Sequence, residues 1–176
     1  VAPYVTSQLA GAFLAALVLF AIFEPYLLAK ETAKGVVRGE PGSEITAMCY
    51  GEYFPNPGEL AAGDTPYDSQ LHAELNQRVS QTAACFVEVL GTMILALVVS
   101  AVTDPRNQLG HSKLGPVFIG LTVAVLICVL APLTQACFNP ARDFGPRLFT
   151  WLAGWGEIAL PGPRGLGFLT VYIISP

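Results

Sequence analysis

Three stretches of the chain are apolar and long enough to cross a lipid bilayer, and polar segments separate them. They cover residues 1–23, 82–102 and 114–134, and a further apolar stretch begins at about residue 166. A helix of about 20 residues, rising 1.5 Å per residue, spans roughly 30 Å of hydrocarbon. We therefore predict an all-α membrane protein with spanning helices in the first three ranges and a last span that the end of the sequence truncates.

The segment 24–80 is predicted to be a long extracytoplasmic loop. It carries nine of the thirteen acidic residues, only four basic residues, and turn-rich motifs such as "YFPNPGE". In the short loop 103–113, Arg106 and Lys113 outnumber Asp104, and an excess of Lys and Arg in a short loop favours the cytoplasmic side. The two loops are therefore expected on opposite sides of the membrane.

The composition agrees with a membrane protein and excludes several other classes. Charged residues make up 12% of the chain, about half of what is usual in soluble domains. The net charge of −4 gives no indication of nucleic-acid binding. The four cysteines lack the spacing of a metal site, so we expect neither a metal nor a cofactor, and no disulfide framework. Val1 already lies inside an apolar stretch, and Pro176 lies a few residues into another one, so both ends of the sequence are expected to be truncated.

One acid and one amide side chain lie inside the apolar stretches. Glu88 lies in the second, where a carboxylate is costly unless it faces the protein interior or a water-filled path. Gln8 lies in the first, and it is either a first-turn residue that reaches toward water or a donor and acceptor for an adjacent loop.

The stretch "CFNPARDFGPRLF" places a dense polar cluster directly after the third apolar stretch. Asn139 is a favoured N-cap type and Pro140 suits the first helical position, which predicts a short helix over about 140–152 that Gly154 or Gly156 ends. Such a helix is too short to span, and irregular backbone at membrane depth is tolerated only inside protein or along an aqueous cavity. The pattern indicates a pore or binding site. The alternative is an amphipathic helix that lies in the membrane interface, with Trp151 and Trp155 among the lipid headgroups.

The motif "NPARDFGPRLF" resembles the second signature of the aquaporin, or major intrinsic protein, family. Asp143 after Arg142 is similar to the glycerol-facilitator branch, and further motifs fall in the family's order, namely "SQLAGAF", "FPNP", "FVE", "GPVFIGLTVAV", "APLT" and "WLAGWG". The resemblance implies an aquaporin-like right-handed bundle with an inverted repeat, which has six spans and two half-helices when whole. This chain corresponds to helix three through the start of helix six.

The resemblance also implies roles for individual residues. The half-helix would meet the pore at the midplane, and Glu88 and Gln8 would be buried polar residues that support its loop. The pore motif would consist of Asn139, Pro140 and Ala141. The selectivity filter would include Arg142, Ala136 and Ile127. The residues that mark the branch of the family would be Asp143, Arg147, Tyr172 and Ile173.

Two of the filter positions depart from the family's pattern. Ile127 stands where water-specific members have histidine and glycerol facilitators have glycine. Ala136 stands where glycerol facilitators have an aromatic residue. Bulk would thus move from one wall of the filter to the other.

The resemblance implies a passive channel, not an enzyme, for small uncharged solutes. Glycerol-like polyols and water are the expected solutes, with urea and metalloid hydroxides as further candidates, and ions and protons would be excluded. A homotetramer in the plasma membrane is expected. The alternatives are a secondary transporter with a broken-helix site at the midplane, or a truncated channel subunit that does not transport.

Overall fold

The computed structural model describes residues 1–63, 65–107 and 114–176, and every regular element in these ranges is a helix. The prediction of an all-α membrane protein is confirmed. Three of the helices are long and apolar enough to cross a membrane, namely α1 (Ala2–Lys34), α5 (Gln81–Thr103) and α6 (Gly115–Thr134).

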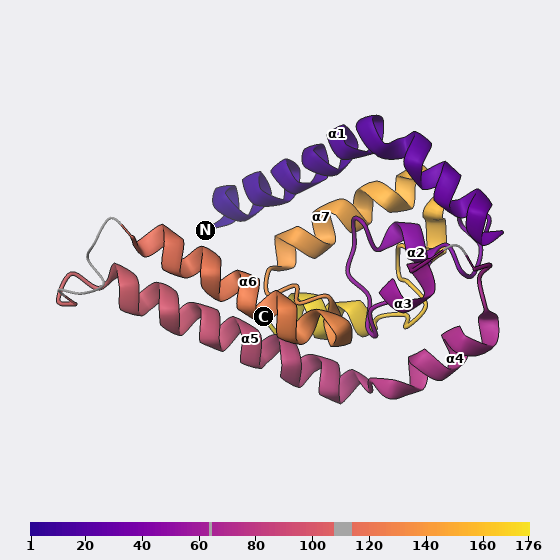
Figure 1. Ribbon diagram of the computed structural model, residues 1–176. Coiled ribbons are helices and arrows are strands. Elements are labelled where there is room, and N and C mark those ends of the chain that lie inside the picture. Colours follow the sequence, from indigo (N-terminus) through magenta and orange to yellow (C-terminus); the bar gives the residue numbers. More distant parts are fainter. Residues whose placement is uncertain (64, 108–113) are drawn as a thin grey trace.

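The three long helices and the short helix α7 form two pairs. Figure 1 shows α5 and α6 side by side as an antiparallel hairpin, and α1 running along α7 (Pro140–Thr150). The turn of the hairpin is described only as far as residue 107, where Arg106 forms an ion pair with Asp104 at 2.8 Å. Lys113, which the topology prediction uses, lies outside the described residues.

Helix α1 continues past the predicted end of its span at residue 23, so the first part of the predicted loop is helical. Its last turn is tied to the segment that follows. Glu31 accepts hydrogen bonds from Arg38 and Thr46, and Lys34 Nζ donates to the carbonyl oxygen of Ala62 at 2.6 Å. The helix ends where Gly35 adopts a left-handed conformation with φ of 67°.

The rest of the predicted loop is also partly helical. It contains α2 (Glu44–Ala47), α3 (Gly58–Ala61) and α4 (Ser69–Arg78). Asp68 is the N-cap of helix α4, and its carboxylate accepts from the N–H groups of Gln70 and Leu71.

Close packing of α1 against α7 depends on a glycine. A Cβ atom on Gly145 would lie 2.8 Å from the Cβ atom of Ala12 and 2.9 Å from the carbonyl oxygen of Leu9. Farther along the same contact, the rings of Phe13 and Phe20 meet the Phe149 ring edge-on, each at 5.6 Å between centroids. The small residues of α1 and Gly145 therefore position the short helix.

The chain beyond α7 turns back toward the core. A wider π-helical turn, Trp151–Trp155, follows α7, and Gly154 within it has φ of 107°. A 3₁₀ turn, Gly156–Ile158, comes next, and the last helical turn is Leu169–Ile174. Trp155 is fully buried and donates to Thr46 Oγ1 at 3.0 Å, which does not fit the alternative of an interfacial helix with this ring among lipid headgroups.

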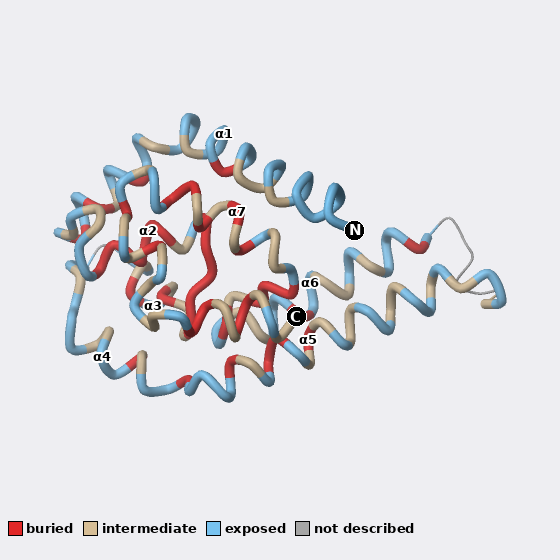
Figure 2. The backbone as a smooth tube through the Cα atoms, turned by 180° about the vertical axis from the view of Figure 1, so that it is seen from behind, coloured by how far each residue is buried: buried red, intermediate tan, exposed pale blue. Residues whose placement is uncertain are grey.

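Burial is concentrated around the short helix. Figure 2 shows buried residues gathered where α7 meets the segment between α1 and α4, while the outer surfaces of α1, α5 and α6 are largely exposed. Apolar side chains such as Leu97 and Val129 are more than 60% exposed on these surfaces. Surfaces of this kind need apolar surroundings, so the chain is part of an integral membrane protein.

Candidate functional site

The N-terminus of α7 is the polar centre of an otherwise apolar region. Asn139 caps the helix, since its Oδ1 atom accepts from the N–H of Ala141 at 3.0 Å, and Pro140 occupies the first helical position. Asn139 and Arg142 are both exposed. The helix dipole gives such a terminus positive potential, and the side-chain N–H groups of Asn139 and Arg142 are the donors there.

The backbone that leads into α7 is strained. Gln135, Ala136 and Phe138 all have positive φ, at 61°, 55° and 53°, a region that residues other than glycine rarely adopt. Glu88 stabilises this conformation from α5. It is fully buried, and its two oxygens accept from the N–H groups of Cys137 at 3.1 Å and Phe138 at 2.8 Å.

Gln135 connects this irregular segment to residues 48–53. Its Oε1 atom accepts from the N–H of Tyr53 at 2.7 Å, and its Nε2 atom donates to the carbonyl oxygen of Met48 at 3.1 Å. Sequence reasoning missed Gln135, although a polar residue directly after an apolar helix is a signal that could have drawn attention to it.

Asp143 and Arg147 form a buried ion pair within α7, with 2.7 Å between Oδ1 and Nη2. The pair also holds the backbone of Glu52. Asp143 Oδ1 accepts from the N–H of Glu52 at 2.7 Å, and Arg147 donates to the carbonyl oxygens of Glu52 and Ala159. These two branch-marker positions therefore fix the place of a residue far away in the sequence.

Glu52 in turn contacts the arginine predicted for the filter. Its Oε1 atom lies 2.7 Å from Arg142 Nη1, and the Glu52 side chain is 4% exposed while that of Arg142 is 46% exposed. Burial raises the pKa of Glu52 to about 8, although the charge of Arg142 acts in the opposite direction. Sequence reasoning missed Glu52 as well. It is the single acid in the aromatic stretch "CYGEYFPNP", which was the available signal.

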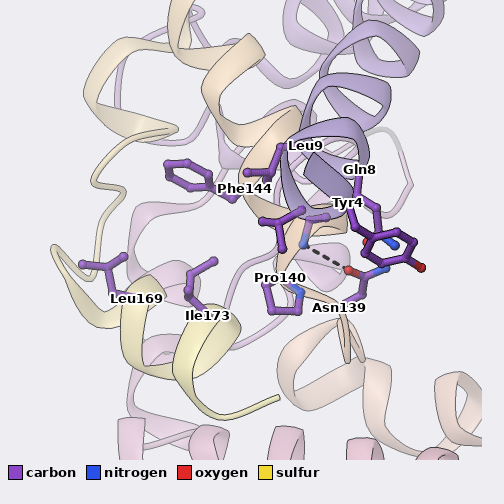
Figure 3. A pocket seen from close by; sticks show the side chains of 10 residues that line it. Tyr4, Gln8, Leu9, Asn139, Pro140, Phe144, Leu169 and Ile173 are labelled. Carbon is purple, nitrogen blue, oxygen red and sulfur yellow. Dashed lines mark hydrogen bonds between the residues drawn. The ribbon is translucent and has the colours of Figure 1, made fainter. Parts of the chain in front are cut away.

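Two grooves meet at the start of α7. One, of about 370 Å³, is mostly apolar, and Figure 3 shows Tyr4, Leu9, Phe144, Leu169 and Ile173 around it. The other, of about 590 Å³, contains the polar residues Glu52, Gln135 and Arg142. Both are lined by Gln8, Asn139 and Ala141. A solute that passed along these grooves would meet donors and acceptors on one side and apolar side chains elsewhere.

Three of the predicted residues are placed differently from the expectation. Gln8 is exposed, not buried, because it faces the two grooves. Ala136 is buried against Leu126 and Phe138, so its side chain does not line either groove, and its carbonyl oxygen accepts from Arg142 Nη1 at 3.4 Å. Ile127 is 39% exposed on α6 and is likewise not part of either groove's described lining.

The last two branch-marker positions lie in the final helical turn. Tyr172 is fully buried, and its ring meets that of Phe54 edge-on at 6.0 Å between centroids. Ile173 lines the apolar groove.

The sequence model of the major intrinsic protein family matches residues 1–176. The chain belongs to the major intrinsic protein family. It is similar to the glycerol uptake facilitator of Pseudomonas aeruginosa, with 38% identity over 98% of this chain and 54% of the relative. The propanediol uptake facilitator of Salmonella typhimurium is 39% identical over 100% of this chain and 59% of the relative. The glycerol uptake facilitator of Escherichia coli K12 is 34% identical over 100% of this chain and 55% of the relative.

The chain spans just over half the length of these relatives. Their names are those of transport proteins, which agrees with the membrane-length helices of this chain. Membership of the family and the position in the membrane, both expected from the sequence, are confirmed.

Proposed function

We propose that the protein containing this chain is a passive channel for small uncharged polyols such as glycerol and propanediol, and not an enzyme. The observation that carries the proposal is the exposed N-terminus of α7, where Asn139 and Arg142 present donors in grooves bordered by apolar helices. A three-carbon polyol has hydroxyl groups on one edge and carbon on the other, so it matches a path with one polar side.

The same features support exclusion of cations. Arg142 keeps its charge at any physiological pH, and the helix dipole adds positive potential at the same point. A cation or a proton would be repelled by this potential, whereas a neutral hydroxyl would only accept and donate hydrogen bonds. Water is expected to pass, and urea and metalloid hydroxides remain further candidate solutes.

Arrangement as a homotetramer in the plasma membrane is part of the proposal, since the resemblance to the family implies it. The exposed apolar faces of the long helices, with side chains such as Leu97 and Val129, are compatible with contacts to lipid or to neighbouring subunits.

The test is solute flux through the full-length protein in proteoliposomes. Stopped-flow light scattering should show glycerol and propanediol entry that rises linearly with concentration and does not depend on an ion gradient. Saturation with ion coupling would instead support a secondary transporter, and flux equal to that of empty liposomes would support a subunit that does not transport.

Arg142→Ala provides the second arm of this test. Removing the guanidinium should widen the polar groove and remove its fixed charge, so larger polyols and cations should pass more readily, by roughly tenfold if one charged contact is lost. Arg106→Ala is the matched control, because Arg106 is 90% exposed in the loop after α5. Identical selectivity in the wild type and Arg142→Ala would show that Arg142 does not face the path.

A further inference from the structure

We propose that Glu52 is a specificity-determining residue of the conduction path, in which its carboxylate holds the Arg142 guanidinium in place and partly balances its charge beside the solute. The inference rests on the proposed function and deepens it. Both residues line the polar groove, and their side chains meet at 2.7 Å.

Buried hydrogen bonds to its backbone N–H and to its carbonyl oxygen fix the position of Glu52. The N–H of Glu52 donates to Asp143 Oδ1, and its carbonyl oxygen accepts from Arg147 Nη2. Asp143 and Arg147 are themselves buried. Glu52 therefore belongs to a fixed wall, although it lies in a connecting segment.

Contacts of the next residue reinforce this wall. The N–H of Tyr53 donates to Gln135 Oε1, and its hydroxyl donates to the carbonyl oxygen of Ile158 at 2.8 Å. Residues before and after α7 thus hold the backbone at Glu52, and these tertiary contacts orient its side chain toward Arg142.

The pair changes the chemistry that a solute meets. Arginine alone offers only donors and a full positive charge. A carboxylate beside it lowers the local charge, because Glu52 Oε1 contacts Arg142. The Glu52 side chain is only 4% exposed, and its Oε2 atom is buried without a hydrogen-bond partner in the described part of the chain, so a solute meets mainly the guanidinium. A guanidinium whose charge is partly balanced still donates to hydroxyl oxygens, so the pair suits neutral polyols.

The carboxylate also restrains the arginine. Arg142 is held by Glu52 Oε1 and, at 3.4 Å, by the carbonyl oxygen of Ala136. When Glu52 loses its charge, the stronger of these contacts weakens and the long side chain gains freedom to extend into the groove. That change should hinder glycerol more than water, because glycerol needs the wider passage.

Protonation of Glu52 provides a readout that a purely structural role would not affect. Burial raises the pKa of Glu52 to about 8, so the carboxylate is mainly neutral below that pH and mainly charged above it. The charges of Asp143 and Arg147 balance each other in a separate ion pair, so Arg142 is the cation that Glu52 contacts. The titratable and charged groups that interact with Glu52 are Arg142, Asp143 and Arg147 from α7, Glu88 from α5, Tyr172 from the last helical turn, and Tyr53 and Cys137 from the connecting segments.

The experiment measures the ratio of glycerol to water permeability in proteoliposomes of the full-length protein, from about pH 6.5 to about pH 9.5. For the wild type, the ratio should rise by about threefold or more across this range, with a midpoint near 8, as the ion pair forms. Glu52→Gln should keep the ratio low and independent of pH. Glu59→Gln is the matched control, because Glu59 is an exposed acid on α3 that pairs with Arg78, and it should behave as the wild type.

The outcomes are distinguishable. A flat ratio in a wild-type protein that conducts glycerol and water would overturn the inference, and so would an unchanged pH profile in Glu52→Gln. Flux no greater than that of empty liposomes would overturn the proposed function and the inference with it. If Glu52→Gln fails to fold, the wild-type profile and Glu52→Asp still decide the matter. The aspartate side chain is one methylene shorter, so its carboxylate lies farther from Arg142, and the ratio above pH 8 should be lower than in the wild type.

Discussion

At the scale of single residues, the site depends on buried polar side chains that satisfy irregular backbone. The segment from Ala136 to Phe138 lies between α6 and α7, and a buried N–H without a partner costs about 1–3 kcal/mol. Glu88 supplies acceptors for two such groups from a neighbouring helix. A carboxylate inside a spanning helix is therefore explained by the backbone that it supports.

Replacing Glu88 tests this account. Glu88→Leu removes both acceptors, so the protein should lose about 1–3 kcal/mol of stability for each N–H group left unpaired, and flux should fall because the entry to α7 is no longer held. Thermal unfolding in detergent and stopped-flow flux are the measurements. Glu157→Leu, at an exposed acid after the π-helical turn, is the control. Wild-type stability in Glu88→Leu would contradict the bracing role.

At the scale of elements, the placement of α7 follows from how closely it approaches α1. A glycine on α7 and small residues on α1 let the two backbones meet, as helix packing in lipid requires. A second such fit lies on α5, where a Cβ atom on Gly91 would be 2.0 Å from the Phe138 ring. Close packing against glycine residues therefore positions both the strained segment and α7, in addition to the hydrogen bonds.

Gly145→Ala should separate α1 from α7. The added methyl group would overlap Ala12 and the Leu9 carbonyl oxygen, and overpacking of this kind costs about 1–3 kcal/mol. Gly120→Ala on α6 is the matched control, because its Cβ atom would meet nothing within 4 Å and alanine favours a helix. Comparison of the two melting temperatures checks the prediction, and equal values would show that the contact tolerates the extra volume.

At the scale of the whole molecule, the contacts around Gln135 bear on how the chain crosses the membrane. Gln135 follows α6, and its side chain bonds to Met48 and Tyr53 in the segment that follows α1. These two connections therefore lie together at the same end of the helices. The last turn of α5 and the first turn of α6 lie at the opposite end of the hairpin in Figure 1.

We predict that the segment from α1 to α5 faces one side of the membrane and the turn after α5 faces the other. Single cysteines at Glu59 and Arg106, both exposed, can be introduced into a variant that lacks the four native cysteines. A membrane-impermeant maleimide applied to sealed vesicles should label one of them and spare the other until the vesicles are opened. Equal labelling from the same side would refute this topology.

The sequence by itself determined the features that arise from local patterns. Apolar length predicted the membrane helices, and the N-cap and proline signals at Asn139 and Pro140 predicted the start of the short helix. The cost of a charge in lipid predicted that Glu88 needs a protein partner. Each of these depends on neighbouring residues and on the solvent, so no knowledge of distant contacts was needed.

Only the tertiary structure decided the features that depend on residues far apart in the chain. The extension of α1 to Lys34 depends on Arg38, Thr46 and Ala62, and the burial of Ala136 depends on α6. Glu52 and Asp143 are 91 positions apart, and their contact directs Glu52 at Arg142. No periodicity or cap encodes such a contact, because it exists only once folding brings the two segments together, and the polar wall of the grooves is made of contacts of this kind.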